Sequence, residues 1–198
     1  SAARVQRKDC GTSVNREWSA LLRRGLKGCF RIEQRMRAES GEEQVPQMRI
    51  LIISDTHKRD ENLLRLLERI KPLDLLVHCG DSEKDEAFYI SLVQCPIQMV
   101  AGNNDFFSGL PREKEFSIGK YKVWLTHGHN YYVSMGNTIL KEEAVSRGVD
   151  IVMFGHTHRP VVEVGRQITA INPGSLAFPR QEGRRPSYIL MELDKDGK

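Results

Sequence analysis

From Met48 onward, short apolar runs alternate with longer segments in which apolar residues recur at helical spacing. Runs with the length of buried strands lie over residues 49–54, 74–78 and 97–100. Between the first two, leucines at helical spacing predict a helix that Asp60 caps and that ends near Pro72, and a second helix is predicted near residues 85–93. Three strand–helix units in series favour an α/β core with parallel strands.

The rest of the chain is richer in strands. Residues 114–118 and 122–126 are predicted to pair as a hairpin through Gly119, and a helix over about 135–147 is predicted to end at Gly148. Further strands are predicted over residues 151–154, 160–164, 167–171 and 187–193. We therefore expect two packed sheets with helices outside them.

The composition is typical of a globular protein and excludes a membrane-embedded one. Of 198 residues, 39% are hydrophobic and 28% are charged, and the length suits one domain with some surplus. No stretch approaches the ~18–20 consecutive apolar residues that a membrane span requires. The cysteines form no CxxC pair, which is typical of reduced thiols in the cytosol. Because the N-terminus also lacks a signal-peptide pattern, we expect a cytoplasmic protein with no membrane partner.

The net charge of +4 lies entirely in the first quarter of the chain. Residues 1–47 carry ten basic and six acidic side chains, whereas residues 48–198 carry 20 of each. A weakly amphipathic stretch over 18–26 predicts two helical turns. We interpret residues 1–47 as an Arg-rich N-terminal extension that either contacts a partner or lies upstream of the true start at Met48. The neutral balance of the predicted domain, residues 48–198, disfavours nucleic acid as a partner.

Five predicted strands end in residue types that bind metals. These residues are Asp55, His57, Asp81, Asn103, His127, His156 and His158. In open α/β sheets the carboxyl ends of strands converge on one crevice, so side chains that are distant in sequence meet there. Carboxylate and imidazole groups are the ligands expected for Mn²⁺, Fe or Zn²⁺. The set is large enough for two ions if one carboxylate bridges them.

A glycine precedes three of these ligand positions. Gly80, Gly102 and Gly155 each allow the backbone to turn sharply and to approach an ion or a phosphate closely, because glycine has no Cβ. Each motif is weak by itself, since Asp-x-His and Gly-Asp both occur by chance. The ordered set of five motifs is specific.

The ordered pattern D-x-H, G-D, G-N-x-D, H and G-H-x-H resembles that of the calcineurin-like metallophosphoesterases. Among them, the chain is most similar to the small YfcE-like prokaryotic phosphodiesterases, and the resemblance covers nearly all of residues 48–198. It implies an α/β fold in which two mixed β-sheets pack as a sandwich flanked by helices, giving four layers (αββα). It also implies a dinuclear metal centre at the strand ends.

Carried over position by position, the resemblance implies two sets of ligands. One ion would be held by Asp55, His57, Asp81 and His158. The other would be held by Asp81, Asn103, His127 and His156, so that Asp81 is the bridging carboxylate. The resemblance suggests Mn²⁺, with Ni, Fe, Co and Zn as alternatives. Two ions about 3.5–4 Å apart generate a hydroxide and clamp the phosphoryl oxygens during in-line displacement.

One position departs from the family pattern. Many family members carry a histidine directly after the Gly-Asn pair, where it is proposed to protonate the leaving group or bind phosphate, whereas this chain has Asn104. An amide can donate a hydrogen bond to a phosphate oxygen but cannot act as a general acid. We therefore expect dependence on metal activation and a preference for diesters with good leaving groups. With Asn104, Asp105 completes the candidate catalytic pair; it either fixes Asn103 or a ligand histidine, or only shapes the turn.

Three further polar features have a structural and a functional interpretation. His129 either supports a ligand or is a hydrogen-bonded loop residue. His78 lies inside a predicted strand, so we expect a satisfied core histidine. The Asn-Pro-Gly-Ser turn at 172–175 resembles a turn near the family's site, and we expect a purely structural role for it.

The residues that recognise substrate are less clearly marked. Phe106, Phe107 and Arg112 follow the third motif and either line the pocket or pack within their loop. A basic cluster either binds phosphate or forms a solvated loop; its members are Arg180, Arg184 and Arg185.

These expectations give a functional hypothesis, a metal-dependent phosphodiesterase with weak or no monoesterase activity. Its substrate would be a small-molecule or nucleotide-like phosphodiester. The alternative is a non-catalytic protein-interaction scaffold on the same fold, as in the eukaryotic retromer scaffold subunit, whose metal site is degraded. The intact ligand set favours the enzyme. Family relatives also suggest self-association into a homo-oligomer.

Overall fold

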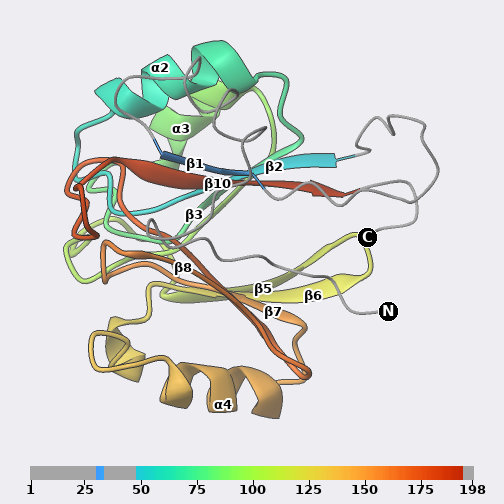
Figure 1. Ribbon diagram of the computed structural model, residues 1–198. Helices are drawn as coiled ribbons and strands as arrows, with labels where there is room; N and C mark the ends of the chain where they lie inside the picture. The colour runs from blue at the N-terminus through green and yellow to red at the C-terminus, as the bar shows by residue number, and fades with distance from the viewer. Residues whose placement is uncertain (1–29, 34–47, 194–198) are drawn as a thin grey trace, which may run out of the picture.

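Two five-stranded β-sheets lie face to face in the computed structural model, which describes residues 30–33 and 48–193 (Figure 1). The first sheet has the strand order β1-β10-β2-β3-β4. Its strands are β1 (Phe30–Glu33), β10 (Ser187–Leu193), β2 (Met48–Ile53), β3 (Leu75–His78) and β4 (Ile97–Met99). Strands β2, β3 and β4 run parallel, as predicted, and β10 runs antiparallel to β2.

The second sheet has the order β5-β6-β7-β9-β8. Its strands are β5 (Glu113–Ile118), β6 (Tyr121–Thr126), β7 (Ile151–Met153), β9 (Thr169–Pro173) and β8 (Pro160–Val164). Strands β6, β7 and β9 are parallel to one another, whereas the edge strands β5 and β8 are antiparallel to their neighbours. Both sheets are therefore mixed, as the family resemblance implied.

Helices cover the outer face of each sheet (Figure 1). Helices α2 (Glu61–Ile70) and α3 (Glu86–Val93) lie outside the first sheet, and α4 (Thr138–Ser146) lies outside the second. A short 3₁₀ helix, η1 (His129–Tyr131), follows β6. The four layers predicted from the resemblance are confirmed. Within the described part of the chain, none of the helices has the length and apolar character needed to cross a membrane.

The core consists of three apolar clusters, and strand β2 contributes to two of them because it is buried on both faces. Leu51 and Ile53 belong to the apolar cluster that packs against α2 and α3. Ile50 and Ile52 point the other way, into the cluster between the two sheets. Successive strand residues face opposite sides, so a strand buried on both faces reads as one continuous apolar run. This explains why the sequence around 50–53 predicted a buried strand.

Several element boundaries differ from the predictions for local reasons. Asp60 occupies the N-cap position of α2 but makes no side-chain capping bond there, because its carboxylate accepts from Lys84 and from the hydroxyl of Tyr89 instead. Strand β9 begins two residues later than predicted, since a turn closed by the Gly165 nitrogen and the Ile168 carbonyl (3.0 Å) precedes it. Strands β4 and β7 are each one residue shorter than predicted.

The segment 1–47 contributes a strand that the sequence pattern did not predict. Residues 30–33 form β1, which pairs in parallel with β10 at the edge of the first sheet. The helical turns predicted over 18–26 lie outside the described residues. The interpretation of residues 1–47 as a separate extension stays a prediction.

Candidate metal centre

The predicted ligands all lie in loops that directly follow strands, at one end of the two sheets. The loop after β2 carries Asp55 and His57, and the loop after β3 carries Asp81. Asn103 follows β4, His127 follows β6, and the pair His156 and His158 follows β7. Parallel strands end at the same edge of a sheet, so this placement is a direct consequence of the topology.

Two groups of these side chains are close enough to hold a metal ion. One consists of Asp55, His57 and His158, and the other of Asp55, Asp81 and His127, with the ligand atoms of each group within 4.8 Å of one another. Asp81 Oδ2 lies 3.9 Å from His57 Nε2 and 3.4 Å from His127 Nε2. Asp55 belongs to both groups, and Asp81, a member of the second, also lies close to His57 of the first.

Asn103 brings the remaining histidine into the site. Its side-chain oxygen lies 3.1 Å from His127 Nε2 and 2.9 Å from His156 Nδ1. His156 is further tied to the first group, because its main-chain nitrogen donates to Asp55 Oδ2 at 3.1 Å. The structure thus brings together all seven ligands that the sequence predicted.

The tautomers of three imidazoles are fixed by acceptors outside the site. The Nδ1 atom of His57 lies 2.9 Å from Glu83 Oε1, that of His127 lies 2.8 Å from the Cys79 carbonyl, and that of His158 lies 2.7 Å from the Phe178 carbonyl. Each acceptor lacks a proton, so each Nδ1 must be the donor. Metal-binding histidines are commonly oriented in this way, with the second ring nitrogen left to bind the ion.

A buried carboxylate oxygen without a hydrogen bond shows that the site suits a cation. Asp55 is fully buried, and its Oδ1 makes no hydrogen bond within the described part of the chain although His158 Nε2 lies 3.1 Å away. His57 Nε2 and His158 Nε2 are 3.5 Å apart and face each other. Converging lone pairs beside a buried carboxylate are costly unless a cation lies between them. The donor set of oxygen and imidazole nitrogen therefore fits a divalent transition metal.

Charge–charge contacts within the site shift the pKa values of its members. Burial by itself would raise the pKa of Asp81, but the close approach of His127 and the hydrogen bonds from Asn104 outweigh it and lower that pKa. Burial would lower the pKa of His127, yet the nearby carboxylates of Asp81 and Asp55 raise it. Burial and the neighbouring His127 lower the pKa of His156. The carboxylates thus attract positive charge to the centre of the site.

The ligand loops adopt a backbone conformation that non-glycine residues seldom use. Five of the seven ligands have positive φ values between 45° and 68°: Asp55, His57, Asp81, His156 and His158. Such strain is maintained only where the surrounding structure fixes it, and it is concentrated at functional sites. These turns direct the ligand side chains of one loop toward the candidate metal centre.

The glycines beside the ligands make room for the neighbouring loops. A Cβ on Gly102 would lie 2.0 Å from Asp81 Oδ1, and one on Gly155 would lie 2.0 Å from the hydroxyl oxygen of Ser54. Gly80 has φ +99°, and its Cβ would lie 2.7 Å from His127 Nδ1. The sequence predicted close approach at these positions; the groups approached are other ligand loops.

Asp105 and Asn104 both act on the loop that carries Asp81. Asp105 is buried, and its Oδ2 accepts from the main-chain nitrogens of Asp81 (2.7 Å) and Gly102 (2.8 Å). Its Oδ1 accepts from the Glu83 nitrogen at 2.6 Å. Asn104 donates from its main chain and its side-chain amide to the two carboxylate oxygens of Asp81, at 2.8 and 2.6 Å. Both residues therefore position Asp81.

The turn at 172–175 connects two ligand loops. Asn172 Nδ2 donates to the Gly155 carbonyl at 2.8 Å, and the Ser175 hydroxyl donates to the Asp55 carbonyl at 2.8 Å. The Ser175 hydroxyl also accepts from the Phe178 nitrogen at 2.8 Å. The turn is structural, as predicted, and it holds the first and last ligand loops together. Its polar composition alone did not reveal these partners.

The two remaining histidines lie near the site without joining either group. His78 is fully buried in β3 and contacts Thr56 and Tyr89, which matches the predicted core histidine. The ring of His129 lies 5.4 Å from that of His127, and His129 is outside both candidate metal groups. Burial and the neighbouring His127 lower the pKa of His129.

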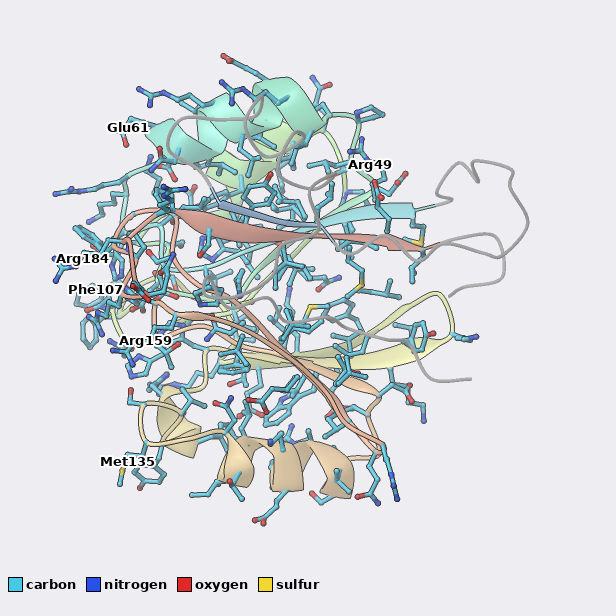
Figure 2. All side chains as sticks on the ribbon, viewed as in Figure 1. Arg49, Glu61, Phe107, Met135, Arg159 and Arg184 are labelled. Atoms are coloured by element: carbon cyan, nitrogen blue, oxygen red, sulfur yellow. The ribbon has the colours of Figure 1, made fainter. Side chains whose placement is uncertain are left out.

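A cleft of about 860 Å³ opens onto the ligands. It is lined by His57, Asp81, Asn103, Asn104, His156, His158, Arg159, Ala177, Phe178, Pro179, Arg180 and Arg184. Of the predicted substrate-recognition residues, Arg180 and Arg184 line the cleft, whereas Phe106, Phe107, Arg112 and Arg185 are not among its lining residues. Phe107 is fully exposed (Figure 2).

Three functional residues escaped the sequence patterns. Glu83 orients His57, Arg159 lines the cleft, and Phe178 lines the cleft and supplies the carbonyl that fixes His158. Arg159 directly follows the last ligand, which was a usable signal. Glu83 and Phe178 act across long sequence separations, so only the fold reveals them.

Comparisons with known proteins agree with this geometry. A family model described as the calcineurin-like phosphoesterase superfamily domain matches residues 48–196. The chain is similar to the probable metallophosphoesterase YsnB of Bacillus subtilis, with 37% identity over 150 residues covering 75% of this chain and 86% of that protein. It is also similar to the phosphodiesterase MJ0936 of Methanocaldococcus jannaschii, with 28% identity over 152 residues, 64% of this chain and 83% of that protein.

A solved structure shows the same fold. Wild-type Vps29 from Entamoeba histolytica, crystallised in complex with Zn²⁺, superposes with a TM-score of 0.62 over 75% of this chain and 88% of that one, at 23% identity. This likeness bears on the fold alone. The family model and the similarity to YsnB show that the chain belongs to the calcineurin-like phosphoesterase superfamily.

Proposed function

We propose that this protein is a metal-dependent phosphodiesterase with weak or no activity toward phosphomonoesters. The observation that carries the proposal is the convergence of all seven ligands with three imidazole tautomers already fixed by Glu83, Cys79 and Phe178. A relative named as a phosphodiesterase, MJ0936, supports the choice of diester hydrolysis. The substrate class is a small-molecule or nucleotide-like phosphodiester.

We assign the ligands to the two sets that the family resemblance implies. Asp55, His57, Asp81 and His158 would hold one ion, and Asp81, Asn103, His127 and His156 would hold the other. Mn²⁺ is the metal we expect, with Ni, Fe, Co and Zn as alternatives. When bound, two divalent ions supply Lewis acidity and activate the nucleophile for phosphoryl transfer.

The chain's own residues determine which esters can react. Asn104 lines the cleft where many family members have a histidine, and its amide is held on Asp81 by a 2.6 Å hydrogen bond. A side-chain amide has no titratable proton near neutral pH, so it cannot protonate a leaving group. Esters whose leaving group departs without protonation should therefore react fastest, and such leaving groups have low pKa values.

A non-catalytic scaffold is the alternative function for this fold. A scaffold does not need fixed imidazole tautomers, a buried carboxylate oxygen without a hydrogen bond, or strained ligand loops, and all three are costly to maintain. Those features favour the enzyme. The scaffold would become the better proposal if the ligand set failed to bind metal.

The test is a metal-supplemented assay on chelator-treated protein. Bis(4-nitrophenyl) phosphate should be hydrolysed with Mn²⁺ present, and 4-nitrophenyl phosphate should be hydrolysed weakly or not at all. Asp81→Asn and His127→Ala should each lower the diesterase rate by about 10³-fold or more, since the first removes the negative charge of the proposed bridging group and the second removes a ligand. Glu142→Gln removes an exposed carboxylate on α4 and serves as the matched control, with wild-type rate. Absence of diesterase activity with Mn²⁺, Ni²⁺, Co²⁺ and Fe²⁺ would overturn the proposal.

A further inference from the structure

Three arginines line the cleft that opens onto the candidate metal centre. They are Arg159, Arg180 and Arg184. Apart from the ligand Asp81, the cleft has no lining carboxylate in the described part of the chain. Figure 2 shows Arg159 and Arg184 on the same side of the molecule. Residues 48–198 as a whole carry equal numbers of basic and acidic side chains. The three arginines therefore make the cleft more positive than the rest of this part of the chain.

None of the three guanidinium groups has an ion-pair partner among the described residues. By contrast, Arg147 pairs with Glu113, Glu115 and Glu143, and so has a structural role. An unpaired arginine is not by itself unusual, because exposed arginines elsewhere on the surface are also unpaired. Unpaired arginines that face a metal centre are unusual, since they add positive charge where two cations would already lie. Such an arrangement suits a substrate with more than one anionic group.

Main-chain hydrogen bonds hold Arg180 at a defined position relative to the metal ligands. The Arg180 nitrogen donates to the His158 carbonyl at 2.9 Å, and the nearby Phe178 carbonyl accepts from His158 Nδ1 at 2.7 Å. Arg184 follows in a turn closed by its own nitrogen and the Gln181 carbonyl at 3.0 Å. The segment 175–185 therefore carries two free guanidinium groups along one wall of the cleft.

We propose that Arg180 and Arg184 bind a second, terminal phosphate group of the substrate while its diester lies over the metal ligands. This inference rests on the proposed phosphodiesterase function. A phosphate monoester carries up to two negative charges and offers oxygens to both guanidinium groups, whereas a carboxylate carries only one charge. The cleft volume of about 860 Å³ exceeds what a bare diester needs. It falls in the upper part of the range for ligand pockets, about 300–1,000 Å³.

A matched pair of substrates tests the proposal. Thymidine 5′-(4-nitrophenyl phosphate) and its 3′-phosphorylated form share the scissile diester and the leaving group, and differ only in one terminal phosphate. In the Mn²⁺-loaded wild type, the 3′-phosphorylated form should have a kcat/KM about tenfold higher or more. Arg180→Gln and Arg184→Gln should each reduce this ratio, and the double variant should bring it close to unity. Arg185→Gln, a neighbouring exposed arginine outside the cleft lining, should keep the wild-type ratio.

Binding of products by calorimetry separates this proposal from the proposed function. Mn²⁺-loaded protein should bind thymidine 3′,5′-bisphosphate about tenfold more tightly than thymidine 5′-monophosphate, and the double variant should not discriminate. Hydrolysis of both diesters with a ratio near unity would overturn the arginine site and leave the phosphodiesterase intact. Selective bisphosphate binding without hydrolysis of either diester would overturn the phosphodiesterase and retain the arginine site. A wild-type ratio in the double variant would also overturn the arginine site.

Discussion

The buried carboxylate of Asp105 accepts a 2.7 Å hydrogen bond from the main-chain nitrogen of Asp81, the residue proposed to bridge the two metal ions. The same carboxylate accepts from Gly102 and Glu83, so it joins the loops that follow β3 and β4. Because the backbone of Asp81 lies in the left-handed region (φ 54°), the loop needs this external support. We therefore propose Asp105 as a positioning residue for the candidate metal centre.

Replacement of Asp105 should weaken metal binding more than it weakens the fold. In Asp105→Asn, an amide NH₂ replaces one acceptor oxygen and faces main-chain donors, so the Asp81 loop should shift. We expect Mn²⁺ affinity, measured by calorimetric titration, to fall by about 10–100-fold. Asp150→Asn is the matched control, because Asp150 accepts from the Lys122 nitrogen at 2.8 Å away from the site. Equal Mn²⁺ affinities in wild type and Asp105→Asn would contradict the positioning role.

Two glycine substitutions should separate an effect on metal binding from an effect on stability. In Gly102→Ala the new Cβ would overlap Asp81 Oδ1, at 2.0 Å, so Mn²⁺ affinity and diesterase rate should fall. Gly148→Ala meets no atom within 4 Å but has φ +66°. It should lower the free energy of unfolding by about 1–2 kcal/mol, with no change in Mn²⁺ affinity. Calorimetric titration and urea unfolding measure the two effects, and a Gly102→Ala variant with wild-type Mn²⁺ affinity would contradict the model of the site.

The ligands could be predicted from the sequence because each lies directly after a strand. Asp55 follows the apolar run of β2 in the first sheet, and His156 follows that of β7 in the second, so the strand pattern alone placed each at the carboxyl end of a strand. The supports of these ligands could not be predicted in the same way. The carbonyl that fixes His127 belongs to Cys79, 48 residues away, and any residue type can supply a carbonyl. Hydrogen bonds to main-chain carbonyls therefore cannot be predicted from the pattern of side chains.

The sequence left open which of the candidate recognition residues line the cleft. Phe106 and Phe107 follow the third motif closely, but both are largely exposed and outside the cleft lining. Arg180 and Arg184, for which phosphate binding was one of two interpretations, do line the cleft, and so does Arg159. The loops after β7 and β9 meet there, since the Arg180 nitrogen donates to the His158 carbonyl. The direction in which a loop leaves a strand depends on turn geometry and on its distant hydrogen-bond partners. Residue composition does not specify either of them.

Introduction of a histidine at position 104 should make the diesterase rate less sensitive to the leaving group. In wild type, log kcat should fall steeply as the pKa of the leaving phenol rises, because Asn104 cannot supply a proton. In Asn104→His, an imidazole lining the cleft should protonate the departing oxygen, and poor leaving groups should gain about 10²-fold in rate. A series of substituted aryl diesters measures both slopes. Asn104→Gln keeps an amide and should retain the steep slope, whereas a shallow slope in wild type would show that another group acts as the acid.

Acid should destabilise the protein in part through His78. Burial lowers the pKa of His78 from 6.5 to about 4, a larger effect than the attraction of Asp105 and Asp55. Its Nδ1 accepts from the Gly80 nitrogen at 3.2 Å, so the neutral ring has no free site for a second proton. Between about pH 4 and pH 6.5, His78 is therefore protonated in the unfolded chain and neutral in the folded protein. The stability that His78 contributes is therefore present above about pH 6.5 and is lost as the pH falls toward about 4.

The size of this loss can be measured by urea unfolding in the presence of a chelator, which removes the contribution of bound metal. Between about pH 7 and about pH 5, the shift at His78 should cost the wild type about 2 kcal/mol of unfolding free energy. His78→Gln retains polar atoms without a titrating group, so its loss over the same interval should be smaller by that amount. Gln167→Ala is the control, because it changes an exposed side chain outside β3 that has no titrating group, so its loss should equal that of the wild type. Equal losses in wild type and His78→Gln would show that protonation of this ring does not limit acid stability.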